Sequence, residues 1–378
     1  MRVVGVLCCL SSFSFSGCVG DDIPPRPIEA PNLDACDAGP CPTELVSAPG
    51  CEDNGSLNAI DLVVADGVVF WTNKHAGTVN SIPTMGGPHR LIASGRPSGP
   101  LAVDGTSIFW VDGAKTIMKA PVAGGSAQVF VQATHVPEVS GTENDINALL
   151  VDQGTLFFGR FTEALKVSTA GGTPTRIGLS PDLGKPAAFA IDATHLYQTE
   201  IDHLAVSREA LDGTQNGFLE GDMTRQRFAP DRIAVSQGDL VLDAIAVVNG
   251  NVIWTNLNII HSKPVDASEH DLFLPIAGTV PSSKITGFVV SDETIFLGEA
   301  GFGKVNVVEK VPLLAPQPAL LGGGAADAGG ADGGAVNDEA LATPVVIANE
   351  QMSASQFAAD ATNIYWRTKD CKIMRLAK

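Results

Sequence analysis

The chain has 378 residues, of which 44% are hydrophobic and only 17% are charged, and it contains 40 glycines and 24 prolines. This composition predicts many short strands joined by frequent turns, and it argues against long amphipathic helices. The 42 acidic residues outnumber the 24 basic ones and give a net charge of −18. Such a surface repels polyanions, so nucleic acid is excluded as an expected partner. The acidity is interpreted as favouring solubility outside the cytoplasm rather than as a cation store.

The first 17 residues are predicted to be an export signal. One basic residue, Arg2, precedes an apolar run that is too short to span a bilayer. The run ends in Phe15-Ser16-Gly17-Cys18, which resembles the lipobox of bacterial lipoproteins, although that family usually has Leu where this chain has Phe15. The resemblance implies that Cys18 carries a lipid and becomes the new N-terminus. The alternatives are an ordinary cleaved signal and an uncleaved anchor.

Lipidation of Cys18 would place the protein in the cell envelope, attached to a membrane and facing the periplasm or the cell exterior. Residues 18–41 contain five prolines and little apolar material. They are predicted to form a flexible linker between the lipid and the folded part, residues 42–378.

One unit recurs along the folded part: an apolar strand, a tight turn containing Asp, Asn or Gly, and a second strand that ends in an aromatic pair or a related pair. The seven copies occupy residues 64–71, 103–110, 151–158, 191–198, 248–254, 290–297 and 359–366. A third strand follows each pair, and a Gly-Gly turn leads to a fourth strand after Gly86, Gly124 and Gly171. The shortest repeat spacings match a four-stranded propeller blade. The sequence therefore predicts an all-β propeller of seven four-stranded blades, with six or eight as alternatives.

The repeats resemble those of bacterial propeller proteins that read V-D-x-x-x-I-Y-W, and more distantly the YWTD propellers of lipoprotein receptors. The segment from Asp360 to Trp366 matches best. The resemblance covers roughly residues 43 to 378 and implies a fold rather than a function.

The repeated acidic and aromatic positions have structural interpretations. The acids are predicted to cap the backbone of their own turns rather than to bind a metal. The aromatic side chains are predicted to pack between blades, each burying area worth roughly 1.5–3 kcal/mol. The positions are Asp66, Trp71, Asp104, Trp110, Asp152, Phe158, Asp192, Tyr197, Trp254, Phe296, Asp360 and Trp366.

The seventh repeat ends after its third strand, near Leu376. Thr43–Ser47 precedes the first blade and resembles a fourth strand, so a last blade composed of both chain ends is predicted. Cys36, Cys41, Cys51 and Cys371 remain as an even set in an oxidising compartment. Four cysteines allow three pairings, of which antiparallel pairing of the terminal strands favours Cys51–Cys371 with Cys36–Cys41. A zinc site is a weak rival because no CxxC spacing occurs.

The Gly-, Ala- and Asp-rich segment at about 322–338 cannot bury a core and is predicted to be a disordered loop between the third and fourth strands of blade six. Longer insertions are also expected at 133–146 and 200–232. The sequence has no HExxH or GxSxG motif, and no catalytic residue, cofactor or metal site is assigned. The predicted function is a binding or scaffolding module for a protein or carbohydrate. The alternatives are a metal-dependent hydrolase or lactonase with its site in the central funnel, and a mainly structural propeller.

Overall fold

The computed structural model describes most of the predicted propeller. The described residues are 41–47, 61–132, 145–161, 163–177, 185–200, 205–212, 227–228, 244–256, 259–265, 274–278, 283–301, 307–313, 345–348, 351 and 354–378. Cys18, Cys36, Cys51, the export signal and the 322–338 segment lie outside them. Every regular element in these ranges is a strand, and none of them contains a helix able to cross a membrane.

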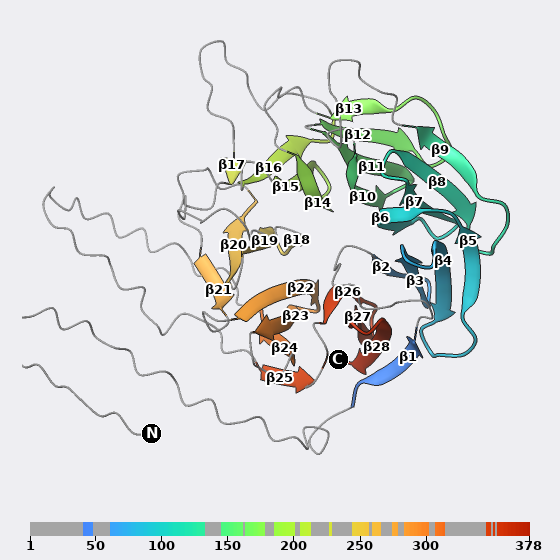
Figure 1. The fold of residues 1–378 in the computed structure, drawn as a ribbon. Coiled ribbons are helices and arrows are strands. Elements are labelled where there is room, and N and C mark those ends of the chain that lie inside the picture. Colours follow the sequence, from blue (N-terminus) through green and yellow to red (C-terminus); the bar gives the residue numbers. More distant parts are fainter. Residues whose placement is uncertain are drawn as a thin grey trace, which may run out of the picture. The chain divides into compact units, whose positions relative to one another are not determined.

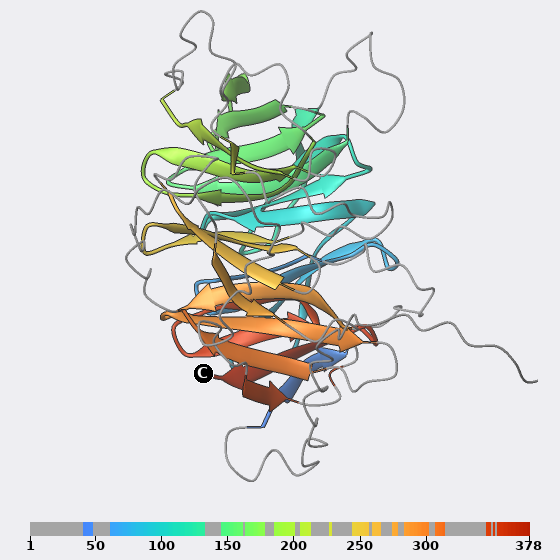
Figure 2. The ribbon, with the colours of Figure 1, turned by 90° about the vertical axis from the view of Figure 1, so that its left-hand side faces the viewer.

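The strands form seven antiparallel sheets of four strands each, arranged around one axis as a β-propeller (Figures 1 and 2). Blades 1 to 3 are regular, and in each of them the four strands follow in chain order. Blade 1 is β2 (Leu62–Ala65), β3 (Val68–Asn73), β4 (Thr78–Pro83) and β5 (Arg90–Ser94); blade 2 is β6 (Pro97–Val103), β7 (Ser107–Asp112), β8 (Thr116–Pro121) and β9 (Gln128–Gln132); blade 3 is β10 (Ile146–Asp152), β11 (Thr155–Arg160), β12 (Glu163–Ser168) and β13 (Thr175–Ile177).

Blades 4 to 6 repeat the same order. Blade 4 is β14 (Pro186–Ile191), β15 (His195–Glu200), β16 (Ala205–Ala210) and β17 (Arg227–Phe228); blade 5 is β18 (Ile245–Val248), β19 (Asn251–Asn256), β20 (Ile259–Pro264) and β21 (Leu274–Gly278); blade 6 is β22 (Ser283–Ser291), β23 (Thr294–Gly301), β24 (Val307–Pro312) and β25 (Val345–Ala348). The predicted seven-bladed fold is confirmed.

The two chain ends share blade 7, as predicted. Its first three strands are β26 (Ser355–Ala359), β27 (Asn363–Arg367) and β28 (Lys372–Ala377), and its outer strand is β1 (Thr43–Ser47). β1 runs antiparallel to β28, with Thr43 opposite Arg375 and Ser47 opposite Lys372. The innermost strand of blade 1, β2, lies against both β26 and β6. The ring is therefore closed, and β28 has no free edge.

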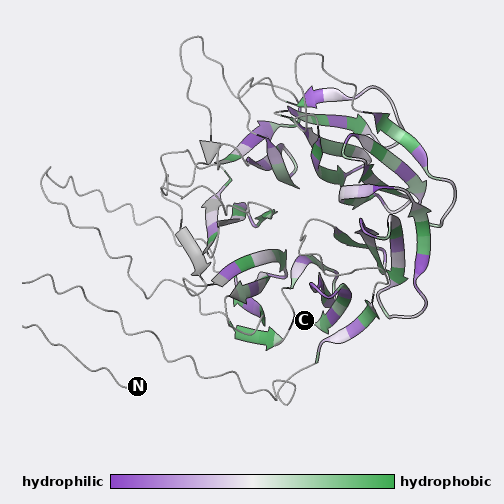
Figure 3. Ribbon diagram, in the orientation of Figure 1, coloured by the Kyte–Doolittle hydropathy of each residue, from purple (hydrophilic) through white to green (hydrophobic). Residues whose placement is uncertain are grey.

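The hydrophobic core is divided into seven clusters, one at each interface between neighbouring blades. Successive side chains of a strand point to opposite faces of its sheet, so the two residues of each aromatic pair enter different interfaces. Phe109 packs toward blade 3, for example, whereas Trp110 packs toward blade 1. The alternation is visible as green and purple bands along the strands (Figure 3).

Candidate functional site

At one end of each blade, the first turn, between strands one and two, lies beside the end of strand three. In blades 1 to 3 the third turn, between strands three and four, follows at the same end. In each blade the first residue after strand three donates its backbone N–H to a carbonyl of the first turn, at 2.7–3.1 Å. Thr84, for instance, donates to Gly67, and Val122 donates to Thr106. These seven equivalent bonds align the first turns and the ends of the third strands on one side of the ring. We call this side the turn face.

The acids of the first turns adopt two arrangements. Asp104, Asp192 and Asp360 each accept two backbone N–H bonds from the residues two and three positions later, at 2.7–3.0 Å. In the second arrangement the backbone itself makes a tight turn with two positive φ angles, as at Asp66 (49°) and Gly67 (73°). Asp152 precedes a turn of this second kind, formed by Gln153 and Gly154.

The three capping acids stay ionised because of these bonds. At Asp360, partial burial raises the pKa, but hydrogen bonds from Tyr365, Thr362 and Asn363 outweigh burial and lower the pKa to about 2. The Tyr365 hydroxyl donates to Asp360 Oδ2 at 2.7 Å, and Tyr197 donates to Asp192 in the same way. Corresponding bonds also hold the pKa values of Asp104 and Asp192 below their usual range, against the effect of burial. The turn face thus carries a ring of carboxylates near the axis.

The predicted aromatic positions all lie in the interfaces between blades, and none of them is more than 4% exposed. They are Trp71, Trp110, Phe158, Tyr197, Trp254, Phe296 and Trp366. Blade 4 departs from the pattern, because Gln198 occupies the position that Trp110 holds in blade 2. Gln198 is fully buried, and neither its amide oxygen nor its amide nitrogen has a hydrogen-bond partner among the residues that the structure describes. Ser207, directly opposite on β16, is 3% exposed and its hydroxyl has no hydrogen-bond partner.

Basic side chains link the blades on the turn face, and the sequence analysis missed them. Lys119 on β8 donates to the carbonyl of Thr169 in blade 3 at 2.6 Å, and Arg375 on β28 donates to that of Thr84 in blade 1 at 2.7 Å. The same strand-three position supplies two further bonds, from Lys166 to Leu211 and from Arg208 to Val265. Each acceptor is the first residue after strand three of the next blade. A base recurs eight to ten residues after the aromatic or related pair in these four blades, and this spacing could have been detected in the sequence.

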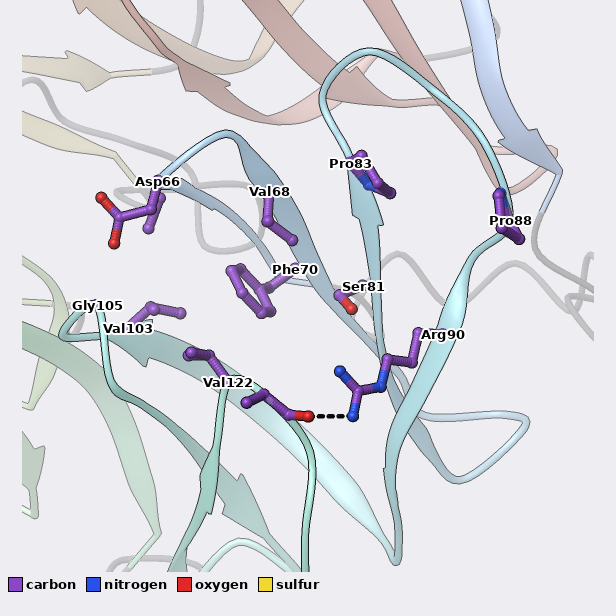
Figure 4. A pocket seen from close by; sticks show the side chains of 12 residues that line it. Asp66, Val68, Phe70, Ser81, Pro83, Pro88, Arg90, Val103, Gly105 and Val122 are labelled. Carbon is purple, nitrogen blue, oxygen red and sulfur yellow. Dashed lines mark hydrogen bonds between the residues drawn. The ribbon is translucent and has the colours of Figure 1, made fainter.

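A pocket of about 320 Å³ opens on the turn face between blades 1 and 2. Val68 and Phe70 of blade 1 face Val103 and Val122 of blade 2 across it (Figure 4). Most of the remaining lining is apolar as well, with Asp66 at one end and Arg90 at the other; Arg90 donates to the carbonyl of Ala123. Met85, in the adjacent third turn of blade 1, is 81% exposed. The pocket can therefore accept an apolar group and is flanked by one charge of each sign.

The predicted sulfur sites are only partly within the described residues. Cys371 is 4% exposed and lies directly before β28, and Cys41 lies two residues before β1. Cys36 and Cys51 lie outside the described ranges, so the pairing stays a prediction, as does lipidation of Cys18. In the part of the chain that the structure describes, no three His, Cys, Asp or Glu side chains gather as a metal site would require.

No protein-family model and no curated protein matches this chain. Solved structures do match. The chain is similar to a catalytically inactive virginiamycin B lyase from Staphylococcus aureus crystallised with quinupristin, at 12% identity and a TM-score of 0.61, covering 89% of this chain and 99% of the other. It is also similar to the computationally designed Ika8 protein, at 12% identity and a TM-score of 0.51, covering 89% and 99%. At this identity the likeness shows a shared propeller fold and no more.

Proposed function

We propose that the protein is an exported, lipid-anchored binding module that contacts a protein partner through its turn face. The observation that carries this proposal is the apolar pocket between blades 1 and 2, with Met85 exposed beside it. Protein interfaces are centred on pockets that receive a large apolar side chain, surrounded by a polar rim. Each of the seven blades is held by a backbone hydrogen bond between its first turn and the end of its third strand, so the turn face offers a rigid base for such a contact.

A protein suits this face better than a carbohydrate, the other candidate from the sequence. Sugar hydroxyls need several hydrogen-bonding groups, because each one buried without a partner costs about 1–3 kcal/mol. The polar lining residues of the pocket are Asp66, Ser81 and Arg90, and the Arg90 guanidinium is already bonded to Ala123. The large apolar side chains exposed among the described residues are all aliphatic: Met85, Leu91, Val129, Val345 and Val346.

A hydrolase or lactonase with its site in the funnel would need ionisable side chains converging at one mouth of the channel. The carboxylates of the first turns are instead spread around the ring, and three of them are occupied by capping bonds within their own turns. No observation on the described residues favours this alternative, and we propose binding rather than catalysis.

The second part of the proposal is that the protein is exported and anchored to a membrane of the cell envelope through a lipid on Cys18. It is supported by the Phe15-Ser16-Gly17-Cys18 motif and by the proline-rich linker that ends directly before β1. The expected result of intact-mass analysis is a mature chain that begins at Cys18 and carries the added mass of a lipid. An unmodified chain beginning at another residue would contradict the anchor and leave the binding proposal untouched.

We also propose the pairing Cys51–Cys371 with Cys36–Cys41. Support comes from the register, because Ser47 lies opposite Lys372 and Cys51 follows Ser47 by four residues while Cys371 directly precedes Lys372. Closing a loop of this length stabilises by more than roughly 4 kcal/mol in the chain-entropy model. Peptide mapping without reduction tests the pairing, and a peptide that joins Cys41 to Cys371 would contradict it.

Site-specific photo-cross-linking tests the binding proposal in cells that make the protein. A photoreactive amino acid replaces Met85, and the control places it at Val345, exposed on the outer strand of blade 6. We expect a polypeptide adduct from position 85 that is lost when Ala123→Trp fills the pocket, and no such adduct from position 345. Adducts of equal yield from both positions, or no adduct from position 85, would overturn the proposal.

A further inference from the structure

We infer that the pocket receives one apolar side chain from a basic segment of the partner, with a Lys or Arg of that segment over the carboxylates near the axis. The inference rests on the proposed function and adds the chemistry of the partner.

The size and lining of the pocket define the first half of this description. A volume of about 320 Å³ lies at the lower end of the range for ligand sites, so the pocket holds a single large side chain or a very short segment. Phe70, Val68, Val103 and Val122 meet such a group with carbon atoms only. Removing that side chain from water supplies roughly 1.5–3 kcal/mol, which makes it the anchor of the contact.

The second half follows from the charges around the pocket. Asp66, at the end of the pocket nearest the axis, is exposed, and its carboxylate lies against the first turn of blade 2, beside Asp104. The pKa of Asp104 is held low, and further carboxylates follow around the ring at Asp152 and Asp360.

Of the nearby bases, Arg90 lies at the opposite end of the pocket from Asp66. Arg90 and Lys119 donate to backbone carbonyls of the following blades, and Arg375 bonds the carbonyl of Thr84. Burial, and next the charge of Arg208, lower the pKa of His195, the first residue of β15. The axis side of the pocket is therefore negative, within a chain of net charge −18. Oppositely charged groups give specificity and faster association at such an interface.

A library of random short peptides, selected against the purified full chain, tests the inference. We expect enrichment of peptides in which a large apolar residue lies next to Lys or Arg. The decisive variant is Ala123→Trp, which places an indole in the pocket from an exposed turn position. Its matched control is Ala170→Trp, the same exposed position in the third turn of blade 3.

Ala123→Trp should weaken binding of the selected peptides by more than about tenfold, as loss of an anchor contact does, whereas Ala170→Trp should leave binding unchanged. Asp66→Asn keeps the turn, because Asn tolerates a positive φ, and should weaken binding about threefold in low salt and less in high salt. Glu44→Gln, exposed on the outer strand of blade 7, controls for the loss of one negative charge. Thermal unfolding of each variant checks that the fold is kept.

The outcomes separate the two proposals. Peptides that lack basic residues, or whose binding survives Ala123→Trp, overturn this inference while a cross-link from Met85 still upholds the proposed function. Failure to select any peptide also overturns the inference. Loss of the cross-link from Met85 overturns the proposed function itself.

Discussion

The interface between blades 1 and 2 and the interface between blades 3 and 4 are built from the same repeat and are filled in opposite ways. In the first, Trp110 packs among Phe70, Val79 and Ile92, and only its indole N–H is buried without a partner. In the second, the equivalent position is Gln198, beside Ser207, and the buried apolar cluster contains only Phe157, Ala164, Ile177 and Leu196.

The comparison teaches that a closed ring tolerates one poorly filled interface. Each blade is clamped on both sides, and strong interfaces such as the one between blades 1 and 2 limit the movement of their neighbours. The turn-face hydrogen bonds are the same on both sides of the weak interface, at Thr169 and Leu211. The backbone frame of the turn face is therefore independent of how well each interface is packed.

The largest expected effect comes from truncating the indole of Trp110. Trp110→Ala should lower the free energy of unfolding by about 3–5 kcal/mol, because the side chain is 1% exposed and leaves a cavity. Gln198→Ala, at the equivalent position, should cost less than about 1 kcal/mol, since its amide makes no hydrogen bond to lose. Urea unfolding of both variants measures the contrast. Equal losses would show that the two interfaces do not differ in strength.

The second largest effect is expected from improving the packing of the interface between blades 3 and 4, which we call the weak interface. Gln198→Leu removes two buried polar atoms without partners and keeps a similar volume, so the protein should gain about 1–3 kcal/mol of stability. Val206→Leu, on the other face of β16, is the control and should not stabilise, because that site is already packed. A loss of stability in Gln198→Leu would mean that the amide has a bonded role at this interface.

Much of this architecture could be predicted from the sequence, for a physical reason. Strand alternation, Gly-Gly turns and a short terminal repeat are local features, and blades 1 to 6 each form from one continuous stretch of chain, such as residues 62–94. The shared last blade followed because β28 would otherwise expose an edge. The pocket could not be predicted, because it depends on how Phe70 of one blade meets Val103 of another. Gln198 already stood out in the sequence, but only the structure shows that it is fully buried.

The polar groups of the weak interface should also respond to pH. Burial, and next the charge of Glu200, raise the pKa of Glu209 from 4.5 to about 7. A carboxyl with a raised pKa stabilises the fold below its unfolded-state value, and that contribution is lost as the pH rises through the folded-state value.

We therefore expect the free energy of unfolding to fall between pH 4.5 and 7, by on the order of 3 kcal/mol from Glu209 alone. Burial, and next the charge of Glu299, raise the pKa of Glu309 to about 7, so Glu309 adds to the slope. Urea unfolding across this range measures the slope. Glu209→Gln should flatten it, and Glu163→Gln, which removes a carboxylate on β12 of blade 3, is the control. A slope that is unchanged by Glu209→Gln would place the titration elsewhere.

The smallest expected effect concerns the basic links across the same two interfaces. Lys166 bonds the carbonyl of Leu211 between blades 3 and 4, and Arg90 bonds that of Ala123 between blades 1 and 2. Lys166→Met should cost about 1 kcal/mol, because the link is partly buried and the surrounding core is thin. Arg90→Met should cost a few tenths of a kcal/mol, because Arg90 is exposed to water and its interface is held by the large cluster around Trp110. Lys74→Met, in an exposed turn after β3, controls for the loss of a positive charge. Urea unfolding measures both losses of stability. A larger loss for Lys166→Met than for Arg90→Met would show that a basic link contributes more where the packing beside it is poorer. The reverse order would show that the contribution of the links does not depend on the packing of the core.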